Sequence, residues 1–326
     1  MHKEYLYSSV FADRIKEHIA VRREMGFSYD TQAYWLYLFD QFCSGDNVET
    51  AVVTKQLYES WAAKTDTETK TTQNSRLQAL RSFCVYLTSM GIPTYVPKNL
   101  PCPEKVVPYL MEDEDIREFF KQVDLYDAVN GHPTFKRMAI EYKVIFRLIY
   151  CCGLRNNEAC SLRTENVDIQ KGVATLYCSK GRKDRLVYLP DDLCSLCNDY
   201  ANWINRQFIV PSEWFFPGRD PMKHIPKTSL DRKFNEFWNN TGLAKSCDKK
   251  PTVHSLRHAF VIKRINSWME SDISLNVMMP YLSRYLGHMS PMETHYYYHQ
   301  TKEAFQTVHR KDSVSGRVIP EVRYEG

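Results

Sequence analysis

The chain has 326 residues, of which 43% are apolar and 13% aromatic, so it is long enough for two domains with hydrophobic cores. Its formal net charge of +4 permits nucleic-acid binding but does not require it, since many soluble enzymes are as basic. No apolar run reaches membrane-spanning length and no apolar signal core follows Met1, so we expect a cytoplasmic protein, without membrane partners, whose ten cysteines stay reduced.

The first hundred residues are predicted to be helical. Apolar periodicity and capping residues place helices over residues 11–27, 31–43, 54–64 and 71–91. In the fourth helix the face opposite the apolar stripe carries a polar, basic set: Lys70, Gln73, Asn74, Arg76 and Arg81. Such a face is either solvated or lies along a phosphate backbone. The candidate DNA contacts here are Lys70, Asn74, Arg76 and Arg81.

A proline-rich stretch without periodicity separates this region from the rest of the chain. We therefore expect a helical domain over residues 1–97, a linker over 98–109 and a second domain over 110–326. The second domain is predicted to open with helices over residues 111–123 and 135–153.

After Gly153 the period changes, and residues 172–190 indicate two β-strands joined by a basic turn. Helices resume at Asp191, so we predict a mainly α fold: an all-helical first domain and a mostly helical second domain with a small antiparallel β-sheet. Cys194 and Cys197 form a lone C-x-x-C on one of these helices, and we expect buried thiols rather than metal ligands.

Four features of the second domain carry side chains suited to chemistry. Arg155 precedes a new helix, Lys180 lies at the tip of the predicted hairpin, and His254 and Arg257 share one helical face. His288 follows a Gly and precedes three consecutive tyrosines at 296–298. Taken singly, each has an ordinary explanation, as a surface arginine, a polar turn, a helix cap or packing.

Taken together, these features resemble the tyrosine recombinase, or phage integrase, family. The segments that carry the resemblance are "GLRNNEACSL", "SKGRKDRLVYLP", "HSLRHAF" and "LGH" followed by a tyrosine. The resemblance spans essentially the whole chain, and it implies a helical core-binding domain, a linker and a catalytic domain. The longer interval of 31 positions between Arg257 and His288 resembles transposon-encoded members.

The resemblance implies DNA strand transfer through a 3′-phosphotyrosyl intermediate, without ATP, metal or other cofactor. Planar guanidinium groups suit the charge on a phosphorane, so Arg155 and Arg257 are expected to form an oxyanion clamp. Lys180 is expected to protonate the leaving 5′-oxygen. His254 is expected to accept the tyrosine proton or bond the phosphate, and His288 to donate to a non-bridging oxygen.

Glu158 and His258 are expected to orient these groups, and Lys183 to hold a phosphate. The family places the nucleophile nine residues after the His of "LGH", which selects Tyr297. Consecutive helical residues point about 100° apart, so three adjacent tyrosines cannot all reach one phosphorus. Tyr298 is the next candidate, with Tyr296 and Tyr298 otherwise packing or touching DNA.

The expected partner is double-stranded DNA carrying recombination sites, with Lys223 and Lys227 as further backbone contacts. The tail after the tyrosines has an apolar stripe, and in the family such tails dock on a neighbouring subunit to give a homo-tetramer on DNA; a disordered tail is the alternative. Accessory recombination proteins are possible partners. Two other classes stay open: a type IB topoisomerase and a catalytically inactive DNA-binding accessory protein.

Overall fold

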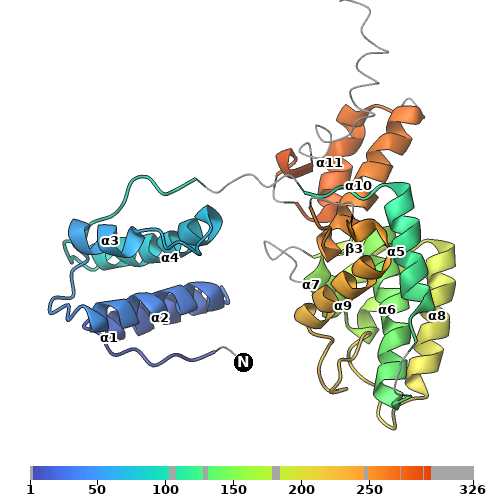
Figure 1. Cartoon of the computed structure of the whole chain (residues 1–326), viewed down its shortest axis with the longest axis horizontal. Helices are drawn as coiled ribbons and strands as arrows, with labels where there is room; N and C mark the ends of the chain where they lie inside the picture. Colours follow the sequence, from blue (N-terminus) through green and yellow to red (C-terminus); the bar gives the residue numbers. More distant parts are fainter. Residues whose placement is uncertain are drawn as a thin grey trace, which may run out of the picture. The chain divides into compact units, whose positions relative to one another are not determined.

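The computed structural model describes residues 3–102, 108–127, 131–177, 184–245, 249–271, 273–288 and 290–294. The chain divides into two compact units, Met1–Val107 and Pro108–Gly326 (Figure 1). The predicted mainly helical fold with a small antiparallel sheet is confirmed. Within the described part of the chain, no helix combines the length and apolar character that a bilayer crossing needs.

The first unit consists, in its described residues, of α1 (Ala12–Glu24), α2 (Asp30–Gly45), α3 (Lys55–Ala62) and α4 (Lys70–Ser89). Helix α4 packs against both α1 and α2. The rings of Phe39 and Phe83 lie 5.5 and 6.1 Å from that of Phe11 at the centre of this core. Thr54 and Thr69 cap α3 and α4, because each hydroxyl accepts a backbone N–H of the first turn at 3.1 Å.

Arg76, one of the predicted DNA contacts, is buried inside the first unit, so that prediction is wrong. Its side chain pairs with Glu68 at 2.7 Å, and both side chains are only 7% exposed. Its guanidinium also donates to the carbonyls of Trp61 and Ala63. A helical pattern shows that a face is polar, but it cannot show that the loop between α3 and α4 folds over that face.

Asn74 is corrected for a similar reason. It is 7% exposed and donates its side-chain amide to the carbonyl of Pro101. Arg81 donates from Nε to the carbonyl of Pro97 at 3.0 Å, although its side chain remains exposed, as does that of Lys70. Helix α4 therefore holds the beginning of the proline-rich stretch against the first unit.

We expect Arg76→Met to destabilise the first unit by about 3 kcal/mol or more, because Glu68 would keep a buried charge without its partner. Lys70→Met is the matched control: it should leave the unfolding free energy within about 0.5 kcal/mol of wild type. If Lys70 contacts a phosphate, this variant should also lower the salt slope of duplex binding by about 0.9. Urea unfolding and titrations at two salt concentrations test both variants. Equal stability of the two variants would contradict the buried role of Arg76.

The second unit is built around α6. Its described α-helices are α5 (Asp113–Leu125), α6 (Pro133–Cys152), α7 (Asn156–Cys160), α8 (Asp191–Asn205), α9 (Lys227–Asn240), α10 (Val253–Glu270) and α11 (Leu275–Leu286). Helix α6 contacts α5, α7, α8 and α10, and α11 packs against α10 and β3. Two short 3-10 turns are Thr164–Asn166 and Leu243–Lys245.

The sheet of the second unit has three antiparallel strands in the order β1-β2-β3. These are β1 (Val167–Asp168), β2 (Val173–Leu176) and β3 (Arg185–Tyr188). Leu176 pairs with Arg185, the first residue of β3, where the hairpin turn begins. The turn residues Lys180 and Lys183 lie outside the described residues.

Aromatic side chains fill the main core of the second unit. The Phe119 ring of α5 lies 4.6 Å from Phe234 of α9 and 5.4 Å from Phe146 of α6. A smaller cluster, which includes Phe260, Met279 and Leu286, joins α10 to α11. These two cores fix the ends of α6, α7, α10 and α11 relative to one another, and the candidate site lies at those ends.

Candidate active site

Helices α6 and α11 both end at a glycine in the left-handed conformation, Gly153 and Gly287, each with φ of 64°. The last carbonyls of a helix lack intrahelical partners and form its negative end. Two arginines bind them. Arg257 donates to Gly153 at 2.6 Å and to Leu286 at 2.8 Å, and Arg155 donates to Gly287 at 2.7 Å. The ends of both helices thus hold guanidinium groups in one place.

Gly153→Ala is expected to destabilise the second unit by about 2–4 kcal/mol. A Cβ there would lie 2.6 Å from the Phe260 ring, and a non-glycine residue at positive φ adds its own cost of about 1–2 kcal/mol. Gly242→Ala is the control, because its φ is also positive, at 78°, while nothing lies within 4 Å of the added Cβ. Calorimetric unfolding of both variants measures the difference; equal losses would contradict the tight α6–α10 contact.

Glu158 links the arginines of the site. Arg155 donates to it twice, from the backbone N–H to Oε2 and from Nη1 to Oε1, both at 2.8 Å. Arg185 donates from both terminal nitrogens at 2.7 Å, and Arg257 Nη1 lies 4.0 Å from Oε2. The Arg257 side chain is only 1% exposed, whereas that of Arg155 is 18% exposed. Arg155 is therefore the arginine of this cluster that solvent reaches most readily.

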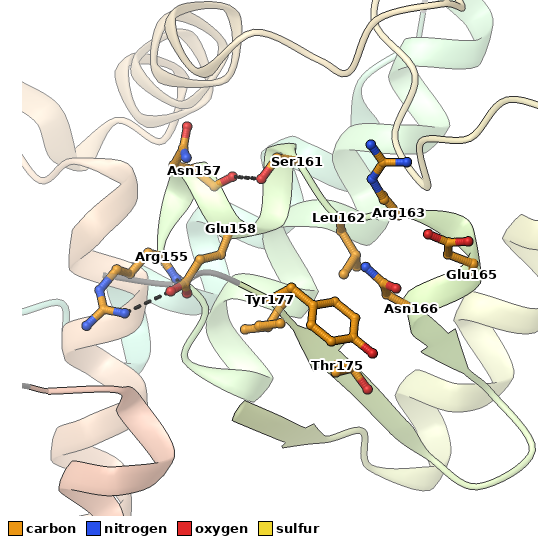
Figure 2. A pocket seen from close by; sticks show the side chains of 11 residues that line it. Arg155, Asn157, Glu158, Ser161, Leu162, Arg163, Glu165, Asn166, Thr175 and Tyr177 are labelled. Carbon is orange, nitrogen blue, oxygen red and sulfur yellow. Dashed lines mark hydrogen bonds and ion pairs between the residues drawn. The ribbon is translucent and has the colours of Figure 1, made fainter. Parts of the chain in front are cut away.

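A cavity of about 500 Å³ opens beside Arg155 and Glu158, between α7 and strand β2 (Figure 2). Figure 2 shows the ion pair of Arg155 and Glu158 at one end of the cavity and the Tyr177 ring over its middle. The remaining lining residues are mostly polar: Asn157, Ser161, Leu162, Arg163, Glu165, Asn166, Thr175 and Leu176. The lining thus carries two arginines, Arg155 and Arg163, and two glutamates, Glu158 and Glu165.

His288 continues the network beyond α11. Its Nε2 lies 3.2 Å from Arg257 Nη2, and its Nδ1 lies 2.7 Å from the Thr294 hydroxyl. Because arginine can only donate, Nε2 accepts in this geometry and Nδ1 carries the proton. Donation from Nε2 to a phosphate oxygen, the role expected from the sequence, therefore requires Nε2 to be protonated and Arg257 to release it.

His254 and His258 stand one helical turn apart on α10, with ring centroids 4.5 Å apart in an edge-to-face arrangement. His254 is exposed, while His258 is 9% exposed. Desolvation by the surrounding protein, followed by the charges of Arg257 and Arg155, lowers the pKa of His254 to about 4. Burial, followed by His254 and Arg257, lowers the pKa of His258 to about 3. Both rings are thus neutral at pH 7, and a neutral His254 can accept a proton.

We expect acid to destabilise the second unit through His258. Its pKa is lower in the folded chain than the unfolded value of about 6.5, so its contribution is complete above that pH and is lost as the pH falls toward 3. The loss is at most about 1.4 kcal/mol per pH unit. Urea unfolding of wild type and His258→Gln at pH 7, 6 and 5 isolates the contribution of His258 to the free energy of unfolding, because the carboxylates titrate in the same way in both proteins. Parallel pH profiles would contradict it.

Six sequence-predicted residues thus lie together in the second unit: Arg155, Glu158, His254, Arg257, His258 and His288. Lys223 and Lys227 are exposed, and each is within 4 Å of an aspartate oxygen. Lys180, Lys183 and Tyr296–Tyr298 lie outside the described residues, as does the tail beyond them.

Sequence inspection missed Arg185 and Thr294 as members of the network. Arg185 follows the basic turn, where it looked like one more turn cation, yet it is 7% exposed and pairs with Glu158 across 27 positions. Thr294 is fully buried beside His288. A basic residue placed first in a strand, on the side that faces the sheet's covered surface, is the signal that could have found Arg185.

In the part of the chain that the structure describes, no three His, Cys, Asp or Glu side chains lie close enough together to bind a metal ion. Cys197 is buried as expected, and burial raises the pKa of its thiol to about 12. Cys194 is half-buried and lies 3.3 Å from the carbonyl of Leu189. Protonated thiols of this kind are poor nucleophiles and poor metal ligands.

Comparisons with known proteins agree with one another. The family model described as "Phage integrase family" matches residues 118–304. The integrase/recombinase candidate y4rB of Sinorhizobium fredii is 26% identical over 93% of this chain and 97% of its own length. The tyrosine recombinase XerC of Halalkalibacterium halodurans is 24% identical over 74% of this chain and 75% of its own.

Solved structures show the same fold. The XerH site-specific recombinase, in a pre-cleavage complex with its difH substrate, matches with a TM-score of 0.65 and 17% identity. The match covers 90% of this chain and 83% of that one.

Proposed function

The chain belongs to the phage integrase family and is a tyrosine-type site-specific recombinase, and on this premise we propose that it cuts and rejoins double-stranded DNA through a 3′-phosphotyrosyl intermediate. Tyr297 would attack the phosphorus and release a 5′-hydroxyl, so the bond energy is kept in the phosphotyrosine. The observation that carries the proposal is the network in which Arg155, Glu158, Arg257 and His288 share hydrogen bonds or ion pairs.

Each side chain has a role that its geometry allows. Arg155 and Arg257 donate guanidinium N–H groups to helix carbonyls, and some of these groups would donate instead to the non-bridging oxygens of one phosphate. His254, neutral at pH 7, would accept the tyrosine proton. Lys180 would protonate the leaving oxygen. The cations that stabilise the transition state then come from the chain's own side chains.

We propose the first unit as the core-binding domain and the second as the catalytic domain, with double-stranded recombination sites as substrate. XerH, whose fold the chain shares, was solved with its difH substrate. Exposed Lys70 and Arg81 on the first unit and Lys223 and Lys227 on the second would contact phosphates. Because the substrate is DNA, we place the protein in the cytoplasm with it.

The proposal has two further parts. The protein would serve a mobile element, and it would assemble as a tetramer on two DNA sites through exchange of the C-terminal tail. The mobile-element role is supported by the 31 positions between Arg257 and His288, which resemble transposon-encoded members. The interval includes most of α10 and all of α11. Accessory recombination proteins would act on the assembled complex.

The test is a covalent-capture assay. The chain is incubated with a library of duplexes that carry randomised sequence and one nick, so that cleavage releases a short 5′-hydroxyl fragment and traps the adduct. A denaturing gel should show protein joined to DNA, and sequencing of the trapped strand should give one preferred site. The absence of any adduct would favour an inactive accessory protein.

A type IB topoisomerase would also give an adduct, so the captured site is next placed in plasmids. We expect two-site plasmids to yield recombined products. A topoisomerase would relax supercoiled plasmid with one site or none and recombine neither, and that outcome would contradict the proposal.

A further inference from the structure

We propose that Arg185 is a positioning residue for strand cleavage: it neutralises Glu158, so that Arg155 and Arg257 direct their charge at the phosphate. The proposal rests on the function proposed above and deepens it. Arg185 comes from β3, whereas Arg155 and Glu158 come from the start of α7. The inference therefore concerns a residue that the recombinase motifs of the sequence did not single out.

The contact between Arg185 and Glu158 is a two-pronged ion pair. Nη1 donates to Oε1 and Nη2 donates to Oε2, both at 2.7 Å. The side chains are only 7% and 10% exposed. A planar guanidinium that engages both oxygens of a carboxylate fixes the plane of that carboxylate as well as its position. Glu158 is thereby locked in the orientation in which it binds Arg155.

Glu158 in turn determines where Arg155 lies. It accepts the Arg155 backbone N–H and its Nη1, both at 2.8 Å, and so fixes both ends of the residue. The third arginine, Arg257, lies 4.0 Å from the same carboxylate. Any movement of Glu158 would therefore be passed to both members of the expected oxyanion clamp.

The charge balance gives Arg185 a second effect. Three guanidinium groups around one carboxylate leave a net charge of two positive units for an incoming phosphate. Without Arg185, the negative charge of Glu158 would offset one of the two positive charges of Arg155 and Arg257, and these three groups would keep one positive unit. In a site this little exposed to water, such a difference acts strongly on a developing phosphorane.

The glycine at the end of α11, Gly287, leaves room for the guanidinium groups of Arg185 and Arg155. A Cβ on Gly287 would lie 3.1 Å from Arg185 Nη1 and 3.4 Å from Arg155 Nη1. The glycine, at φ of 64°, brings the end of the helix against both guanidinium groups. Elements β3, α7 and α11 thus meet at Arg185, whose surroundings are built as part of the site.

The first experiment compares Arg185→Met with Arg117→Met in the covalent-capture assay at saturating protein. Arg117 is the control because it also belongs to an ion pair of the second unit, with Glu114, but those side chains are 71% and 61% exposed and lie outside the candidate site. We expect Arg185→Met to lower the single-turnover rate by about 10- to 100-fold, less than the ~10²- to 10³-fold that follows loss of a direct oxyanion donor. Arg117→Met should cleave at the wild-type rate. Equal rates for wild type and Arg185→Met would overturn the inference.

The second experiment separates charge from folding. Circular dichroism of Arg185→Met detects any loss of folded structure, and Arg185→Lys accompanies it. Lysine keeps the charge but not the two-pronged contact, so this variant should give an intermediate rate. In the double variant Arg185→Met/Glu158→Gln the uncompensated carboxylate is gone, so we expect cleavage at least about 5-fold faster than in Arg185→Met alone. A double variant no faster than the single one would overturn the electrostatic role.

The third readout uses a substrate with methylphosphonate at the captured scissile position. This group lacks the charged non-bridging oxygen that the clamp neutralises, so the ratio of wild-type to Arg185→Met rates should shrink. An unchanged ratio would indicate a merely structural residue and overturn the inference. Failure of the wild type to form any adduct on ordinary DNA would instead refute the proposed function, so the two failures are distinguishable.

Discussion

Tyr297→Phe is expected to remove the covalent protein–DNA adduct completely. The substitution deletes a single oxygen, the atom that would form the bond to phosphorus. Folding and DNA binding should be unchanged, because the ring stays. The measurement is the denaturing gel of the covalent-capture assay, with duplex binding measured by titration of the same preparations.

The matched controls for this experiment are Tyr296→Phe and Tyr298→Phe. The sequence predicts a helix over these residues, in which consecutive side chains would diverge by about 100°, so we expect neither neighbour to occupy the position of the nucleophile. Both variants should form the adduct at close to the wild-type rate. If Tyr298→Phe alone lost the adduct, the nucleophile would lie one residue further on; if all three variants kept it, a tyrosine mechanism through this segment would be refuted.

Arg155→Gln and Arg257→Gln are expected to lower the cleavage rate by at least about 10²- to 10³-fold each, because each removes a charged donor from the same phosphate. Their effects on stability should differ. Arg257 is buried and joins the ends of α6 and α11, so its loss should cost about 3–5 kcal/mol. Arg155 is partly exposed, and Arg185 would still neutralise Glu158, so about 1–2 kcal/mol is expected.

Arg232→Gln is the control for both arginine variants, since Arg232 is exposed on α9. Its rate and its melting temperature should match those of wild type. The rates are measured under single-turnover conditions at a temperature where calorimetry shows all variants folded. Wild-type cleavage by Arg155→Gln would contradict the clamp, whereas a low rate that recovers fully on cooling would assign its loss to stability alone.

The long helices were predictable where an apolar face of regular period ends at a recognisable boundary residue. Thr54 and Gly153 were identified as helix boundaries from the sequence, and they cap α3 and α6 in the structure. Strand β1 was not predicted, because its two residues carry no periodic pattern. The long interval between Arg257 and His288 is visible in the sequence, but only the structure shows that it includes the whole of helix α11.

The polar face of α4 shows where a sequence pattern fails. Arg76 and Asn74 look like surface residues because they are polar, yet both are buried. Their partners are mostly backbone carbonyls of the end of α3, of the loop that follows it and of the proline-rich stretch after α4. Carbonyls are present at every position, so no residue type in the sequence marks them as partners.

The candidate site also contains residues that the sequence predicted and residues that it did not. Arg155, His254, Arg257 and His288 were found by their order and spacing, and the structure places them together. Arg185 was missed, because its contact with Glu158 depends on how the hairpin pairs and on where α7 begins.

The most direct measurement is a crystal structure of the chain trapped on the nicked duplex identified by covalent capture. Guanidinium nitrogens of Arg155 and Arg257 should both lie within about 3.2 Å of non-bridging oxygens of the phosphate that is joined to Tyr297. A trapped phosphate that only one of the two arginines reaches, or that neither reaches, would contradict a shared clamp and the mechanism built on it.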